Sequence, residues 1–327
     1  MPPPANLVYY PDSAPGIARR RHGRGFTYTA PDGTTIADRA ERKRLAGLAV
    51  PPAYDDVWIS PKTNGHLQAT GKDTRARKQY RYHPDWRAYR EATKFDNLAA
   101  FGTALPAIRR RISRDLSGEA GDVDFAIAAV LALIDRTAIR VGTPEYAEEN
   151  GSFGATTLEG RHMVVKDGSI ALRYTAKGGT KVREALSDKR LARVLEKLHD
   201  LPGRHLIGWV DDGGDTHAVS SEQVNARLSD IVGTDGITAK TFRTWAGSTA
   251  AMETALRDGA LTIKAMSEAA AERLHNTPTI ARNSYIHPDV VALTEVEEAK
   301  RAALTRDLPE TRGLRIPERA LLRLLDG

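Results

Sequence analysis

The sequence contains no cysteine among its 327 residues. This absence excludes disulfides, thiolate metal sites and a cysteine nucleophile together. No apolar run reaches the roughly 18 residues that a membrane-spanning helix needs, so we expect no membrane association. The amino end, MPPPANLVYYPDSAPG, has neither a basic leader nor an apolar stretch and therefore predicts no signal peptide. Together these absences predict a cytoplasmic protein.

Common cofactor motifs are missing as well. Neither G-x-x-x-x-G-K-[S/T] nor G-x-G-x-x-G occurs, so no nucleotide cofactor is expected, and the nine histidines show no H-E-x-x-H spacing. The acidic stretch DDGGD, residues 211–215, could in principle hold a hard cation. Asp and Gly are foremost turn formers, however, and we predict a polar turn there. The sequence thus predicts neither a cofactor nor a metal.

What the chain does have is positive charge, concentrated at its front. The net charge is +6, yet residues 1–90 hold 16 Lys and Arg against 8 Asp and Glu, so the remaining residues carry a net charge of −2. A basic front section attracts a polyanion through charge steering and counterion release. A solvated basic face would have the same composition.

The length favours two domains. Between residue 25 and about residue 83, three strand-like stretches each lead into a turn signal: FTYT, DVWIS and HLQAT. A short helix that ends before Pro51 is predicted by ADRAERKRLAGL. Helical patterns dominate from Trp86 onward. We therefore predict the α+β class, with a small β-rich domain over residues 1–90 and a larger, mainly α-helical domain over residues 91–327.

Two features stand out in the second domain. One buried helix is predicted over residues 122–144, DVDFAIAAVLALIDRTAIRVGTP. Asp122 is its expected N-cap and Gly142 is part of its expected stop, so Arg140 is expected in the last turn. A three-stranded β meander is then predicted by GRHMVV, SIALRYT and KVREAL. Lys177 lies at the tip of its second hairpin. Helices are expected from about Ser187 nearly to the end.

Five polar residues in these elements form a pattern. They are Arg140 in IRVGTPEY, Lys177 in RYTAKGGTKV, Arg243 in KTFRTWAG, and Asn276 and Tyr285 in HNTPTIARNSY. Each alone has a structural explanation. Their order and spacing resemble the catalytic residues of type IB DNA topoisomerases, particularly the compact poxvirus-type enzymes and their bacterial relatives. GHLQATGKDTRARKQYRYHPDWR is similar to the DNA-contacting end of that family's amino-terminal domain, so the resemblance covers roughly residues 45–290.

The resemblance implies relaxation of supercoiled duplex DNA through a 3′-phosphotyrosyl intermediate, without ATP or metal, by a nucleoid-associated monomer that clamps DNA. Tyrosine is an oxygen nucleophile that can attack a phosphodiester and later leave as phenolate, a role that falls to Tyr285. Arg140, Arg243 and the amide of Asn276 can donate hydrogen bonds to the nonbridging phosphate oxygens, which carry more negative charge in the transition state. Lys177, on a hairpin, is suited to protonate the expelled 5′-oxygen.

The same resemblance implies DNA contacts by a Gln-Tyr-x-Tyr stretch and by a further tyrosine and lysine: Gln79, Tyr80, Tyr82, Tyr146 and Lys240. On an alternating strand Tyr80 and Tyr82 share one face, while Gln79 lies on the other. Ordinary packing is the alternative explanation for these tyrosines.

Two other functions have to be weighed. Tyrosine recombinases share the catalytic fold and nearly the residue set, but they typically have His-x-x-Arg where this chain has Lys240-Thr-Phe-Arg243. A noncatalytic basic DNA-binding protein would explain the charge but not the five-residue order. Asn276 departs from poxviral and eukaryotic members, which usually have histidine there, although bacterial relatives can have asparagine. One helical step rotates a side chain by about 100°, so His275 is expected to face elsewhere.

Overall fold

The computed structural model describes residues 4–74, 76–234, 236–257 and 259–326. The chain divides into two compact units, Met1–Lys94 and Phe95–Gly327. The first unit is built on an antiparallel sheet, and the second is mainly helical with a three-stranded sheet, so the predicted α+β class is confirmed. No helix in the described ranges has both the length and the apolar character needed to cross a membrane.

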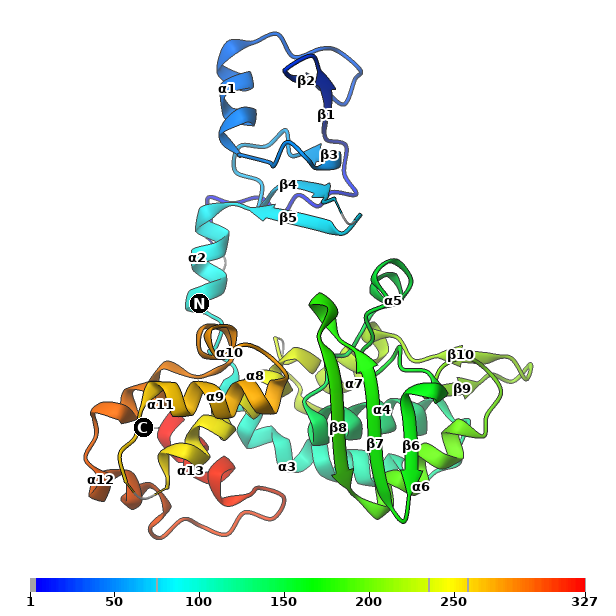
Figure 1. Ribbon diagram of the computed structural model, residues 1–327, viewed down its shortest axis with the longest axis vertical. Coiled ribbons are helices and arrows are strands. Elements are labelled where there is room, and N and C mark those ends of the chain that lie inside the picture. The colour runs from blue at the N-terminus through cyan, green and yellow to red at the C-terminus, as the bar shows by residue number, and fades with distance from the viewer. Residues whose placement is uncertain (1–3, 75, 235, 258, 327) are drawn as a thin grey trace. The chain divides into compact units, whose positions relative to one another are not determined.

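The first unit is a five-stranded antiparallel sheet in the order β2-β1-β3-β4-β5, accompanied by two helices (Figure 1). Its elements are β1 (Ile17–His22), β2 (Gly25–Thr29), α1 (Arg39–Gly47), β3 (Asp55–Ile59), β4 (Leu67–Lys72), β5 (Lys78–Tyr82) and α2 (Pro84–Ala92). The predicted strands and short helix are confirmed; β1, which carries three arginines, was not predicted. Leu45 of α1 packs against Ile59 and Ala69 of the sheet to close a small core.

The second unit places a central helix between a sheet and further helices. Its first elements are α3 (Leu98–Asp115), α4 (Val123–Thr137), α5 (Pro144–Asn150), η1 (Gly160–His162), β6 (Met163–Lys166), β7 (Ser169–Thr175), η2 (Lys177–Gly179), β8 (Lys181–Ser187), α6 (Lys189–His199), β9 (Gly208–Val210), β10 (Thr216–Ala218) and α7 (Ser221–Val232). The remaining elements are α8 (Ala239–Ala255), α9 (Ile263–Leu274), α10 (Pro278–Tyr285), α11 (Pro288–Ala292), η3 (Leu293–Glu295), α12 (Glu298–Ala302), η4 (Ala303–Thr305) and α13 (Ile316–Leu325).

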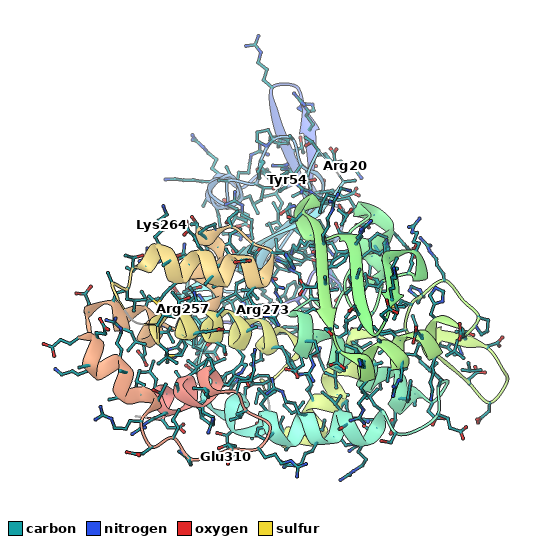
Figure 2. All side chains as sticks on the ribbon, turned by 60° about the horizontal axis from the view of Figure 1, so that its bottom comes forward. Arg20, Tyr54, Arg257, Lys264, Arg273 and Glu310 are labelled. Carbon is teal, nitrogen blue, oxygen red and sulfur yellow. The ribbon has the colours of Figure 1, made fainter. Side chains whose placement is uncertain are left out.

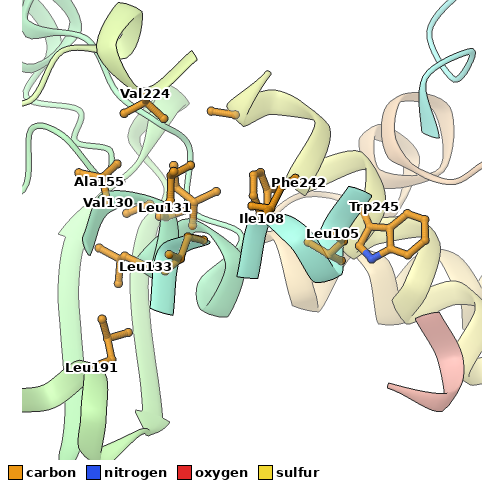
Figure 3. Close-up of a cluster of buried hydrophobic side chains, with 14 of the residues drawn as sticks. Leu105, Ile108, Val130, Leu131, Leu133, Ala155, Leu191, Val224, Phe242 and Trp245 are labelled. Atoms are coloured by element: carbon orange, nitrogen blue, oxygen red, sulfur yellow. The ribbon is translucent and has the colours of Figure 1, made fainter. Parts of the chain in front are cut away.

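The core of the second unit forms around α4, because this helix is apolar on nearly every side and is buried along most of its length. Figure 3 shows Leu131 and Leu133 of α4 in one cluster with Leu105 of α3 and with Phe242 and Trp245 of α8. This packing fixes α8 against α3 and α4. The predicted meander is confirmed as the antiparallel sheet β6-β7-β8, with Lys177 at the second hairpin's tip.

The structure corrects the predicted end of the buried helix. Helix α4 ends at Thr137, so Arg140 lies in the following loop and not in a last helical turn. Ala138 takes a left-handed conformation with φ of 53°, which reverses the chain direction. The loop is then held from outside, because the carbonyl of Arg140 accepts a hydrogen bond from Ala155 N at 2.8 Å.

The expectation of uninterrupted helices after Ser187 was also wrong, because the hairpin β9–β10 lies between α6 and α7. The DDGGD stretch is its turn. Asp211 accepts hydrogen bonds from Gly213 N at 2.9 Å and from Asp215 N at 3.0 Å, and it contacts His217 Nε2 at 2.6 Å. The predicted polar turn is confirmed.

Candidate active site

Arg243 on α8 lies at the centre of the candidate site and is only 4% exposed. Its Nη2 donates to the carbonyl of Leu274, at the end of α9, at 3.0 Å, and its Nη1 donates to the carbonyl of Ala138, at the end of α4. The guanidinium thus satisfies carbonyls that two helix ends leave without an intrahelical partner. Burial, and next the charge of Arg140, lower the pKa of Arg243.

Tyr285, the last residue of α10, places its ring beside this guanidinium. The Arg243 Cζ lies 5.1 Å from the ring centroid. The main chain around Tyr285 is held by Ser248 of α8, whose hydroxyl donates to the Tyr285 carbonyl and accepts from His287 N, both at 2.9 Å. A Cβ atom at Gly247 would lie 2.9 Å from the Tyr285 Cβ, so the close approach of α10 to α8 depends on this glycine.

The surroundings make Tyr285 more acidic than a free tyrosine. Burial raises the pKa of Tyr285, but the neighbouring charge of Arg243, followed by those of Arg140 and Lys240, outweighs burial, so the pKa lies below its ordinary value. Lys240 is exposed in the first turn of α8. A phenol in this setting ionises more readily, which is the condition for an oxygen nucleophile.

Asn276 follows the end of α9 and joins Arg140 to the site. Its Oδ1 accepts a hydrogen bond from Arg140 Nη2 at 3.4 Å, a long contact, while its Nδ2 is buried without a partner. The Nε atom of Arg243 is likewise buried without a partner. Two N–H donors of the site are therefore unsatisfied within the described part of the chain.

His275 contacts the sheet, but the helical step expected from the sequence is not the reason, because α9 ends at Leu274, before His275 and Asn276. It caps α9 in a left-handed conformation, with φ of 49°, and its Nε2 lies 2.5 Å from Glu184 Oε2 on β8. Arg273, at the end of α9 (Figure 2), donates through Nη2 to the carbonyl of Arg136 at 2.8 Å. These contacts tie the segment that presents Asn276 to the sheet and to α4.

Four of the five predicted residues thus come together from four segments: Arg140, Arg243, Asn276 and Tyr285. Lys177 is placed differently. It is exposed on η2, and its Nζ lies 5.2 Å from the centre of the Tyr146 ring on α5. The hairpin tip around it consists of Gly178 and Gly179, with φ of 81° and 82°.

The remaining predicted DNA contacts lie in the first unit, on β5. The rings of Tyr80 and Tyr82 stack with centroids 6.1 Å apart and are 45% and 40% exposed, so the predicted shared face is confirmed. Gln79 points differently, since its Nε2 donates to Asp73 Oδ2 at 3.0 Å. Lys78 Nζ lies 5.6 Å from the Tyr80 ring centre.

Sequence analysis missed Ser248 and Gly247, which position Tyr285. A signal was present, because a glycine inside a helix costs about 1 kcal/mol relative to alanine and usually has a packing reason. Glu184 was missed as well. Its partner His275 lies far away in the sequence, and nothing local links the two residues.

Comparison with known families shows to which protein family this chain belongs. Residues 25–73 match the family described as bacterial DNA topoisomerase IB, N-terminal domain, and residues 83–284 match eukaryotic DNA topoisomerase I, catalytic core. The second match alone spans more than half of the chain. The chain belongs to the type IB DNA topoisomerase family. It is therefore an isomerase that acts on DNA, and this prediction is favoured over the recombinase alternative.

Individual relatives agree with this family. DNA topoisomerase 1B of Acanthamoeba polyphaga mimivirus is 27% identical over 234 residues, which cover 70% of this chain and 69% of the relative. DNA topoisomerase I of Monkeypox virus is 22% identical over 255 residues, which cover 74% and 76% of the two chains. Vaccinia virus (strain Copenhagen) DNA topoisomerase 1B gives the same figures. The solved XerH site-specific recombinase bound to its difH substrate matches with a TM-score of 0.36 at 16% identity, over 55% of this chain and 49% of that one.

Proposed function

We propose that Tyr285 is the nucleophile with which this topoisomerase relaxes supercoiled duplex DNA. The observation that carries the proposal is the placement of the Tyr285 ring against the buried guanidinium of Arg243, with the pKa of the phenol lowered. Attack of the phenolic oxygen on a phosphodiester forms a 3′-phosphotyrosyl bond and breaks the bond to the 5′-oxygen. After strand rotation, the 5′-hydroxyl attacks the same phosphorus and releases the tyrosine.

Arg140, Arg243 and Asn276 stabilise the charge that develops on the nonbridging oxygens. The unpartnered Nε of Arg243 and Nδ2 of Asn276 support this role. A buried donor without an acceptor costs about 1–3 kcal/mol, and a phosphate oxygen would satisfy both donors while the reaction proceeds. An amide donates at any ordinary pH, so Asn276 can replace the histidine of other members.

Lys177 is the acid that protonates the leaving 5′-oxygen. Its place on an exposed Gly-Gly hairpin tip supports a role that requires movement. In the free protein its ammonium group lies against Tyr146, an attraction worth about 0.5–1 kcal/mol at an exposed site. Contact of Tyr146 with DNA would compete with this pairing and release Lys177 toward the phosphodiester.

The first unit supplies most of the nonspecific attraction to DNA. Its surplus of positive charge supports this role, as do the stacked, half-exposed rings of Tyr80 and Tyr82 beside Gln79. Lys240 adds a DNA contact next to Tyr285. The enzyme acts as a cytoplasmic, nucleoid-associated monomer that clamps duplex DNA, and it uses neither a nucleotide nor a metal.

Plasmid relaxation in EDTA without ATP tests the proposal. We expect a ladder of topoisomers and, after denaturation by detergent, protein attached covalently to a DNA 3′-end. Tyr285→Phe removes only the nucleophilic oxygen, so it should bind duplex DNA but form no adduct. An adduct formed by Tyr285→Phe would remove Tyr285 as nucleophile, and a strict need for ATP or a divalent ion would overturn the cofactor-free mechanism.

A further inference from the structure

A row of four rings crosses β5 and continues onto the amino-terminal segment of the first unit. We call it the aromatic row; its members are Tyr80, Tyr82, His66 and Tyr9. Beside the stacked rings of Tyr80 and Tyr82, the His66 ring lies with its centroid 6.3 Å from that of Tyr82 and is tilted by 44°. His66 stacks in turn on Tyr9, at 4.5 Å and with an interplanar angle of 17°. Tyr9 is 75% exposed, so the row ends in a ring that is largely open to solvent.

Tyr9 is held in this position although its ring is exposed. On one side, Val8 N donates to the carbonyl of Asn64 at 2.9 Å, and the carbonyl of Val8 accepts from His66 N at 2.8 Å. On the other side, Tyr10 N donates to His66 Nδ1 at 2.9 Å. The backbone on both sides of Tyr9 is therefore fixed to the turn before β4, and the ring stacks on His66.

The chemistry of the row suits a nucleic acid better than a protein core. A tyrosine that is three-quarters exposed buries too little apolar area to contribute much to folding. A fixed ring loses little conformational entropy on binding, and this is why tyrosine is frequent in interfaces. His66 itself is only 7% exposed, so it supports the Tyr9 ring and offers little surface of its own. The charge comes from the surrounding unit, whose surplus of lysine and arginine favours a polyanion and repels a second copy of itself.

We propose that Tyr9 is a DNA-contacting residue that extends the surface of Tyr80 and Tyr82 and packs its ring against the sugar–phosphate backbone of duplex DNA. Tyr9 precedes residue 25, where the matched family segments begin, so neither family match includes it. The proposal rests on the proposed function, since it takes the face of Tyr80 and Tyr82 as the DNA-contacting face.

The test measures equilibrium binding of a short fluorescent duplex in a Tyr285→Phe background, which prevents covalent trapping. Tyr9→Ala should weaken binding roughly 5- to 10-fold, because the apolar area that the ring buries against the sugars is lost. Tyr9→Phe keeps the ring and should stay within about twofold of the parent. The salt dependence of binding should be unchanged, because a neutral ring releases no counterions. Val164→Ala, which trims another exposed apolar side chain, on β6, is the matched control.

Thermal unfolding of Tyr9→Ala should match that of the parent because the ring is mostly outside the core. Tyr80→Ala separates the two proposals. If Tyr80→Ala weakens binding but Tyr9→Ala does not, the inference about Tyr9 is wrong and the DNA-contacting face stands. If neither variant weakens binding while the wild type relaxes plasmids, the assigned face is wrong. If Tyr9→Ala abolishes self-association and leaves DNA binding intact, the row binds a second copy, and the inference is overturned.

Discussion

The hydroxyl of Ser248 holds the carbonyl of Tyr285 at 2.9 Å, from the same helix that carries Arg243. The same hydroxyl accepts a hydrogen bond from His287 N at 2.9 Å. One helix therefore positions both the proposed nucleophile and the guanidinium beside it.

Loss of this hydroxyl should therefore misplace Tyr285. We expect Ser248→Ala to lower the rate of single-turnover cleavage about 10- to 100-fold, in line with the cost of small misplacements at reacting atoms. DNA affinity should be unchanged. Stability should fall by about 1–3 kcal/mol, because two backbone groups lose their partner. Ser248→Thr, which keeps a hydroxyl, is the control; a normal cleavage rate in a destabilised Ser248→Ala would show that Ser248 only stabilises the fold.

The pH profile of cleavage should reveal the acidified phenol. Because the pKa of Tyr285 is lowered, the phenolate becomes populated at lower pH than in a free tyrosine, whose pKa is near 10. The rate should therefore rise with pH and level off below that value. Lys240→Ala removes one contributing charge, so its profile, measured at saturating enzyme, should shift to higher pH. An unshifted profile would mean that Lys240 does not act on the phenol.

Asn276 should act as a neutral donor. Removing one transition-state donor typically costs about 10²–10³ in rate, so Asn276→Ala should be slow but active. Asn276→His should keep substantial activity, and its rate relative to wild type should gain a pH dependence, since imidazole is a cationic donor only below a pKa near 6.5. Single-turnover cleavage between about pH 5 and 9 measures this. If Asn276→Ala cleaves as fast as wild type, the donor must be sought elsewhere.

Lys177→Ala should slow cleavage of an ordinary phosphodiester greatly. It should have much less effect on a substrate whose 5′-oxygen is replaced by sulfur, because a thiolate leaves without protonation. The matched control is Lys181→Ala on the same hairpin, whose Nζ bonds Thr175 Oγ1 at 2.8 Å. Equal losses by Lys177→Ala on both substrates would rule out the role of general acid.

Glu318 of α13 forms a buried ion pair that ties the end of the chain to the core. It accepts from Arg109 of α3 at 2.9 and 3.0 Å and from Trp245 Nε1 of α8 at 3.3 Å. Burial raises the pKa of Glu318, but the hydrogen bonds and charge of Arg109 outweigh burial and lower it to about 2. A carboxyl with a lowered pKa stabilises the fold above its unfolded pKa, near 4.3, and loses that contribution as the pH falls toward 2.

Urea unfolding at several pH values tests this ion pair. We expect Glu318→Gln to lower the free energy of unfolding at pH 7 by about 3–5 kcal/mol, because Arg109 keeps its charge but loses one of its buried partners. The loss of stability between about pH 5 and 2 should be less steep in the variant than in wild type. Identical slopes would contradict the lowered pKa.

Local sequence signals predicted most of the fold, and the failures have physical causes. The Gly178-Gly179 pair marked the hairpin that carries Lys177, because such turns need positive φ. The end of α4 was misplaced because Ala138 adopts a conformation that usually signals glycine or asparagine. The bond from Arg243 to the carbonyl of Ala138 stabilises that turn and comes from a distant helix, so no local pattern predicts it.

The order of the candidate residues was readable from the sequence, whereas their assembly was not. The family resemblance predicted Tyr285 and Asn276 as site residues. The contacts of Gly247 and Ser248 with Tyr285 exist only once α10 packs on α8. The contact of Lys177 with the Tyr146 ring was likewise not predictable from the sequence, since it joins two separate elements, η2 and α5.

The two hydrogen bonds of Arg243 to helix ends have a consequence for the design of an inactive variant. Its guanidinium fastens the ends of α4 and α9, so alanine at this position would loosen the segments that present Arg140 and Asn276 along with removing a charge. The activity lost in such a variant would combine the loss of a charge at the phosphate with the loss of structure in these segments. It would therefore overstate the contribution of the arginine to phosphate binding. The proposed nucleophile offers a cleaner test, because Tyr285→Phe removes only the phenolic hydroxyl and leaves the hydrogen bonds of Arg243 to α4 and α9 in place.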